Sequence, residues 1–266
     1  MSLFHYTRLD TFANHILPSG TLMTNSMMGM NDPRESHRSS FGSINLPLEK
    51  LFPGYYSEKT HNDCLFKFGD MVKQRLQVIC FSGANQRGWD NEMMWAHYAD
   101  RQRGVCLEFD EARLLASIDH HFQGLRHELR PVGYESVGHR SKRKDKPWIN
   151  WNERLSSDEN FAEFLEVLSQ QVVFHKSHFW EKEDEKRLLF LNRPERLVVP
   201  YADSLKAVHL GIGAPYPMDE EIFHAIQEKG IKVYVMIYQD DRYDQWVLTR
   251  KGQKWWTSSD DADNRD

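Results

Sequence analysis

Apolar residues recur along the chain in two spacings, one typical of amphipathic helices and one typical of strands. A spacing of three or four residues predicts helices at 9–17, 57–76, 92–99, 111–118, 158–176 and 218–229. Alternating apolar residues, or short apolar runs bounded by turn residues, predict strands at 2–6, 21–24, 77–82, 105–109, 129–134, 196–201, 205–210, 231–238 and 245–249. Helices and strands mix without a regular βαβ order, so we predict an α+β fold with a mixed, mostly antiparallel sheet and flanking helices.

The sequence has no internal repeat and no recognisable linker, so we predict a single domain over residues 1–257. Pro and Gly residues near 36–56 and a basic stretch near 135–157 indicate surface insertions in this domain. Residues 258–266 are small and acidic, which predicts a frayed tail.

Composition narrows the class of protein. Forty per cent of the 266 residues are hydrophobic and the formal net charge is −5, which is typical of soluble globular proteins. No apolar run reaches the roughly 18 to 20 residues that span a bilayer, and we expect a cytoplasmic protein without a membrane partner. The charge argues against a surface that coats nucleic acid. If the protein binds an RNA backbone or a phosphate group, we expect the basic run at 140–146 to be the binding segment. The alternative interpretation of this run is a solvated loop without a ligand.

The three cysteines are Cys64, Cys80 and Cys106, an odd number with wide spacing and apolar neighbours. This pattern predicts buried, reduced thiols and offers no zinc-binding spacing, so we expect no metal. Cys80 lies in the sequence VICF, where no local positive charge would stabilise a thiolate. The flanking residues therefore argue against a nucleophilic role for Cys80.

Polar residues that could contact a ligand gather at four places in the sequence. They are His5, Tyr6 and Thr7 at the end of the first predicted strand; Asn31, Asp32 and Glu35 around a turn at Pro33; Ser82 at the end of a buried strand; and Trp95, His97 and Tyr98 in the predicted helix 92–99. Aromatic residues with a hydrogen-bonding atom suit a pocket wall, but they equally suit the edge of a core. Asn and Asp can likewise serve only the geometry of their own turn.

A further candidate cluster follows Trp180. If the chain is extended from Glu183 onward, Glu183, Glu185 and Arg187 project from one face. Carboxylates in such a cluster can hold ribose hydroxyls and stabilise positive charge at an anomeric carbon. The structural alternative is an edge strand with surface ion pairs, each worth about 0–1 kcal/mol.

Several of these segments together resemble domain of unknown function 2971, a bacterial family. The resemblance extends from Phe4 to about Leu248 and rests on FHYT, NDPRE, ICFS, MWAHYADRQRGVCLEFD and the pattern W-x-x-E-x-E-x-R. NDP and MW-x-HY-A are the most specific of these marks. The family implies no established activity.

A weaker resemblance is to ADP-ribosyltransferases, because the chain opens with a strand ending in HYT, then a helix and a Ser-Gly turn. This resemblance implies that His5 holds the adenosine ribose of NAD and that Tyr98 or Trp95 stacks on nicotinamide. It also implies that Glu185, with Glu183 beside it, binds the nicotinamide ribose and is catalytic. NAD binding is also assigned to Tyr6, Thr7, His97 and Arg187. Substrate binding is assigned to Asn31, Asp32, Glu35 and Ser82.

Three functions are compatible with these residues. The first is an NAD-consuming ADP-ribosyltransferase or glycohydrolase, in a defence or conflict system, with an unknown acceptor. The second is a noncatalytic sensor or adaptor that binds a nucleotide-like small molecule or a peptide. The third is a phosphoester hydrolase that uses Asp32, Glu35, His97 and Glu185.

Overall fold

A computed structural model describes residues 1–36, 47–83, 88–135, 157–215, 219–251 and 254–259. Its strands are β1 Ser2–Thr7, β2 Thr21–Met23, β3 Asn25–Ser26, β4 Gln77–Ser82, β5 Val105–Asp110, β6 His127–Pro131, β7 Gly133–Glu135, β8 His175–Ser177, β9 Glu185–Phe190, β10 Val198–Pro200, β11 Leu205–Leu210, β12 Lys232–Gln239, β13 Arg242–Lys251 and β14 Lys254–Ser259. Its α-helices are α1 Leu9–Thr11, α2 Leu17–Ser19, α3 Pro33–Ser36, α4 Leu48–Leu51, α5 His61–Gln74, α6 Glu92–Tyr98, α7 Glu111–His121, α9 Ser157–Val172 and α10 Glu220–Glu228. A π-helix, η1 Phe12–Ile16, and four 3-10 helices complete the set: η2 Met27–Gly29, η3 Glu58–Thr60, η4 His178–Glu183 and η5 Ala202–Ser204.

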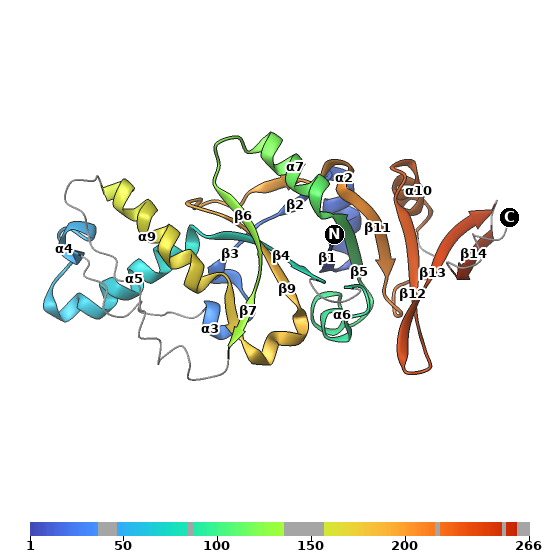
Figure 1. Cartoon of the computed structure of the whole chain (residues 1–266), viewed down its shortest axis with the longest axis horizontal. Coiled ribbons are helices and arrows are strands. Elements are labelled where there is room, and N and C mark those ends of the chain that lie inside the picture. The colour runs from blue at the N-terminus through green and yellow to red at the C-terminus, as the bar shows by residue number, and fades with distance from the viewer. Residues whose placement is uncertain (37–46, 84–87, 136–156, 216–218, 252–253, 260–266) are drawn as a thin grey trace.

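One long twisted sheet runs through the molecule in the order β14-β13-β12-β11-β5-β1-β4-β9-β6, with β3 paired to β4 (Figure 1). Most neighbouring strands in it are antiparallel, and β11 and β12 are parallel. Two small sheets, β10-β2 and β7-β8, lie beside it. The predicted α+β fold with a mixed, mostly antiparallel sheet is confirmed.

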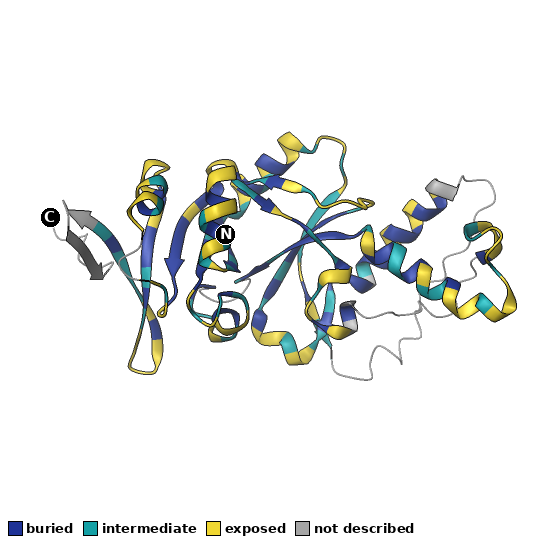
Figure 2. Cartoon of the chain, turned by 180° about the vertical axis from the view of Figure 1, so that it is seen from behind, coloured by how far each residue is buried: buried dark blue, intermediate teal, exposed yellow. Residues whose placement is uncertain are grey.

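Three groups of buried side chains hold the helices against this sheet. The largest joins η1, α7 and α10 to the middle strands and includes Phe12, Leu107 and Phe109. A second joins α5 and α9 to β4 and β9, at the end of the molecule where both helices expose their outer faces (Figure 2). The third lies under α6 and includes Trp95. The helices are therefore fixed by apolar burial, which is the dominant favourable term in folding.

Most predicted elements occur within a few residues of their expected bounds. The predicted strand 129–134 is instead two strands, because Val132 donates its backbone N–H to Glu185 and Gly133 donates to Phe174, so the chain changes its pairing partner there. The predicted helix 158–176 ends at Val172 and is followed by β8. Both differences arise from tertiary pairing, which local periodicity does not encode.

The predicted insertions and tail are described only in part. Within 36–56 the structure contains α4, a short helix that the Pro and Gly residues did not indicate. Ser258 and Ser259, the first residues of the predicted tail, pair with Val247 and Trp246 of β13. The basic run at 140–146 and residues 260–266 lie outside the described residues. Of the helices that are described, none has both the length and the apolar character that crossing a membrane requires.

Candidate functional site

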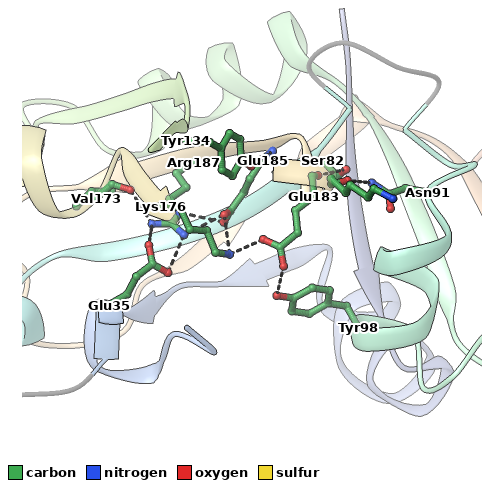
Figure 3. Close-up of polar contacts among 11 residues, drawn as sticks. Glu35, Ser82, Asn91, Tyr98, Tyr134, Val173, Lys176, Glu183, Glu185 and Arg187 are labelled. Atoms are coloured by element: carbon green, nitrogen blue, oxygen red, sulfur yellow. Dashed lines mark hydrogen bonds and ion pairs between the residues drawn. The ribbon is translucent and has the colours of Figure 1, made fainter. Parts of the chain in front are cut away.

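A cavity of about 260 Å³ opens where β1, β4 and β9 meet the segment 23–35 and α6. Its lining brings together residues that are distant in the sequence, namely His5, Tyr6, Asn31, Glu35, Tyr98, Lys176, Glu183, Glu185 and Arg187. Methionines and aliphatic side chains complete the wall. The charged part of the lining forms one connected network (Figure 3).

Arg187 is the centre of this network and is fully buried on β9. Its Nη1 and Nη2 donate to the two carboxylate oxygens of Glu35, at 2.7 and 3.0 Å. Its Nε and Nη2 donate to the two oxygens of Glu185, each at 2.9 Å. Nη1 also donates to the carbonyl oxygen of Val173 at 2.6 Å. Paired, two-bond contacts of this kind are the strongest that a guanidinium makes, and they fix both carboxylates in place.

Lys176 on β8 links the two glutamates of the W-x-x-E-x-E-x-R motif. Its ammonium donates to Glu185 Oε2 at 3.2 Å and to Glu183 Oε2, and it lies 4.8 Å from the centre of the Trp180 ring. Burial lowers the pKa of Lys176, but Glu185 and Glu183 outweigh this and raise it, so the ammonium stays charged.

Glu183 reaches the cavity by a route that strand alternation did not predict. It ends η4 rather than extending β9, and the next residue, Asp184, has a left-handed backbone with φ 48°. This turn brings Glu183 beside Glu185, whereas Glu185 and Arg187 share a face through the expected alternation. The predicted convergence occurs, but the extended conformation assumed for Glu183 was wrong.

Helix α6 is tied to Glu183 from the other side of the cavity. Tyr98 donates its hydroxyl to Glu183 Oε1 at 2.7 Å, and Asn91, the N-cap of α6, donates its side-chain amide to the carbonyl of Lys182 at 2.6 Å. Ser82 donates its hydroxyl to the carbonyl of Glu183 at 2.6 Å. Burial and then the charge of Glu183 raise the pKa of Tyr98, which keeps its phenol protonated.

The two carboxylates that share Arg187 have different electrostatic environments. Burial raises the pKa of Glu185, but the charges of Arg187 and Lys176 overcome this and lower it to about 2. For Glu35 burial is the stronger effect, so its pKa lies above the ordinary value despite Arg187. Three carboxylates face two cations in the network, so the cavity has a formal charge of −1 when all five groups are ionised.

His5 and Cys80 line the same cavity as neutral groups. His5 Nδ1 lies 3.0 Å from the carbonyl oxygen of Cys80, so Nδ1 carries the proton and Nε2 is an acceptor. Burial lowers the pKa of His5, which favours the neutral ring. Burial and then the charge of Glu185 raise the pKa of the Cys80 thiol well above its ordinary value. All three cysteines are free thiols. Cys64 and Cys106 are buried as predicted, whereas Cys80 is only half-buried.

Five predicted site residues do not line the cavity. Trp95 is buried, donates its indole N–H to the carbonyl of Trp89 at 2.7 Å and packs its ring edge to face with Tyr6. His97 is exposed on the outer face of α6, with Trp180 as a ring neighbour. The other three are Thr7, half-buried at the end of β1, Asp32, buried before α3, and Ser82, whose hydroxyl supports Glu183.

Lys176 is the site residue that the sequence did not reveal, because the segment 158–176 had the spacing of a helix through its length. A lysine in the apolar run QVVFHK, close to two glutamates, is the signal that could have identified a buried ion pair. Within the described ranges, no group of three or more His, Cys, Asp or Glu side chains is arranged to hold a metal ion.

Comparison with known proteins supports one family and adds no activity. No curated protein and no solved structure has significant similarity to the chain. The matching family model is described as “Protein of unknown function (DUF2971)” and covers residues 94–188, from α6 into β9. That segment contains Tyr98, Lys176, Glu183, Glu185 and Arg187. The resemblance to domain of unknown function 2971 is thus confirmed over residues 94–188.

Proposed function

We propose that the cavity binds the nicotinamide ribose end of NAD, and that the protein breaks the bond between nicotinamide and ribose and passes ADP-ribose to an acceptor or to water. The observation that carries this proposal is the buried formal charge of −1 beside Tyr98 and His5. Oxidised nicotinamide is a cation, and in the transition state its charge moves to the ribose. A fixed negative charge in a low-dielectric cavity favours both cations.

Glu183 is the carboxylate best placed to contact the ribose. Each carboxylate oxygen can accept about two hydrogen bonds. Both oxygens of Glu185 accept from Arg187, and one of them also accepts from Lys176. Glu183 accepts a single bond at each oxygen, from Tyr98 and from Lys176, so it retains acceptor capacity. We therefore propose that Glu183 contacts the ligand and that Glu185 holds Lys176 in position.

The aromatic and imidazole groups supply the rest of the contacts. The ring of Tyr98 forms a wall on which a flat cationic ring can stack. His5 Nε2 can accept a hydrogen bond from a ribose hydroxyl, since Nδ1 donates to Cys80. Small-molecule pockets commonly measure about 300–1,000 Å³. At about 260 Å³ the cavity suits one end of the dinucleotide, with the other end outside it.

The chemistry requires no redox step. The bond between ribose C1′ and the ring nitrogen breaks, and its electron pair goes to nicotinamide, which leaves as a neutral molecule. The oxygen or nitrogen of the acceptor, or of water, then bonds to C1′ and loses its proton. Glu183 stabilises the positive charge that develops on the ribose, as carboxylates do in glycoside hydrolysis.

Nicotinamide release from NAD by the purified protein, with and without cell lysate as a source of acceptor, tests this proposal. We expect release by the wild type and a loss of about a hundredfold or more in Glu183→Gln, a change that removes the charge and keeps the shape. Glu181→Gln is the matched control, because Glu181 is an exposed side chain in the same 3-10 helix. Absence of NAD binding by calorimetry at millimolar NAD would refute the proposal.

A second function is a noncatalytic sensor of the same kind of ligand. The observation that favours it is that Arg187 and Lys176 bind Glu185 through both of its carboxylate oxygens, which holds this group in place rather than leaving it to act on a ligand. It predicts NAD binding that Glu183→Gln weakens, with no nicotinamide release by the wild type. Phosphoester hydrolysis by Asp32, Glu35, His97 and Glu185 is not proposed, since only Glu35 and Glu185 of this set line the cavity and His97 is exposed.

A further inference from the structure

A second cleft, of about 670 Å³, lies where the parallel strands β11 and β12 begin. Its walls come from the start of α7, from the segment 201–206 around η5 and from the segment 229–232 that joins α10 to β12. It shares no lining residue with the cavity around Glu183. A ligand in this cleft would therefore contact none of the residues that line the first cavity.

The lining of this cleft is rich in positive charge. Its charged residues are Arg113, Lys206, Lys229, Lys232 and Asp203. Lys206 is paired with Glu108 at 2.9 Å. The other three cations face the single carboxylate of Asp203, so the cleft keeps a formal charge of +2. On a chain whose net charge is −5, this is a local field of the opposite sign.

The cations in the cleft are available to a ligand. Arg113, Lys229 and Lys232 are exposed. In the part of the chain that the structure describes, neither Lys229 nor Lys232 is in an ion pair. The guanidinium of Arg113 has a long contact of 3.5 Å with the carbonyl of Asp203, and its charge interacts with the exposed carboxylate of Asp110. They come from three separate segments around a hollow, an arrangement that several linked negative charges can bridge.

The rest of the lining restricts the class of anion. The aromatic ring in the cleft belongs to Tyr201, which is only 3% exposed and donates its hydroxyl to the carbonyl of Ile16. It offers no open face on which a base could stack, which single-stranded nucleic acids require. A volume of about 670 Å³ is that of a small-molecule site rather than a groove for a long chain.

We propose that this cleft binds a short phosphate chain, of two or three linked phosphate groups, through Arg113, Lys229 and Lys232. Inorganic polyphosphate and the phosphate chain of a nucleoside triphosphate share this chemistry. Gly20 and Gly230 border the cleft, and a Cβ atom at either would meet nothing within 4 Å, so the space beside both residues is open.

Calorimetry with sodium tripolyphosphate on the full chain tests the proposal, with ATP and inorganic phosphate as parallel probes. We expect tripolyphosphate to bind, single phosphate to bind much more weakly, and affinity to fall steeply with added salt. Equal binding of ATP and tripolyphosphate identifies the phosphate chain as the whole ligand. Tighter binding of ATP would indicate nucleoside contacts that this lining does not offer, and would overturn the assignment of the phosphate chain as the whole ligand.

Charge reversal then locates the site. Lys229→Glu and Lys232→Glu should each weaken tripolyphosphate binding by about fivefold or more, because each replaces an attraction by a repulsion. Lys59→Glu, an exposed change of the same charge in η3, is the matched control and should leave affinity within about twofold. All three positions are exposed, so thermal unfolding should confirm that the variants fold. Absence of binding at millimolar tripolyphosphate, or equal losses in Lys59→Glu and the cleft variants, would overturn the proposal.

Discussion

Replacing Arg187 with methionine would leave the buried carboxylates of Glu35 and Glu185 without the cation that they share. The wild-type guanidinium makes four bonds of 2.7–3.0 Å to them and is itself fully buried. Removing one partner of such a buried group typically costs about 3–5 kcal/mol. Glu35 would lose the guanidinium that binds both of its oxygens, whereas Glu185 would keep Lys176. Since small proteins are stable by about 5–15 kcal/mol, Arg187→Met should be folded but fragile.

The loss should depend on pH in a direction that identifies its cause. Without Arg187, burial holds the folded-state pKa of Glu35 further above the unfolded value, whereas Glu185 keeps the charge of Lys176, so the folded state binds more protons at Glu35 than the unfolded one. The variant should then become less stable as pH rises from 5 to 8. Urea unfolding at several pH values measures this. Adding Glu35→Gln to the variant removes one uncompensated charge and should restore at least about 1 kcal/mol at pH 8.

Two outcomes would refute this reasoning. One is an Arg187→Met protein whose unfolding midpoint equals that of the wild type at every pH. The other is a variant whose stability loss is the same at pH 5 and pH 8, which would indicate lost packing rather than buried charge. Arg126→Met is the matched control, because Arg126 also pairs with a glutamate, Glu166, but does so at the exposed surface. It should cost no more than about 1 kcal/mol.

Three further predictions concern single groups. Glu185, with its pKa of about 2, should contribute about 3 kcal/mol to the free energy of unfolding above pH 4.5, and this contribution should be lost as pH falls toward 2. Acid unfolding of Glu185→Gln should lack this component. The raised pKa of Glu35 gives a pH dependence of the opposite sign. The Cys80 thiol should resist alkylation by iodoacetamide at pH 8 in the folded protein and react after unfolding, as mass spectrometry would detect. Gly104→Ala should destabilise by more than about 2 kcal/mol in thermal unfolding, because its Cβ would lie 2.2 Å from the carbonyl oxygen of Thr7.

The order of elements could be predicted from the sequence because strand alternation and helical spacing are local. The residues His5, Glu35, Tyr98, Glu185 and Arg187 could also be proposed, since their types and their places at element ends suit ligand contact. That they meet in one cavity could not be derived, because it depends on the pairing of β1 with β4 and of β4 with β9. Contacts between segments 152 residues apart, such as Glu35 to Arg187, leave no periodic trace in the sequence.

Two positions in the structure could not be predicted from periodicity, for related physical reasons. Trp95 and Tyr98 lie three positions apart on α6, and the helix turns Trp95 into the core and Tyr98 toward the cavity. Periodicity indicates that the two residues share a helix, but it does not say which neighbour each will meet. Asp184 has a positive φ that its residue type tolerates only occasionally, and this turn sets the position of Glu183.

The affinity of the wild-type protein for oxidised and reduced NAD tests the proposed function most directly. The two forms differ little in shape, but only the oxidised ring is a cation, so a cavity with a buried charge of −1 should bind oxidised NAD about tenfold or more tightly. In Glu183→Gln the preference should largely disappear, whereas Glu181→Gln should keep it. Equal affinity for the two forms, or tighter binding of reduced NAD by the wild type, would contradict the proposal that the negative cavity selects a nicotinamide cation.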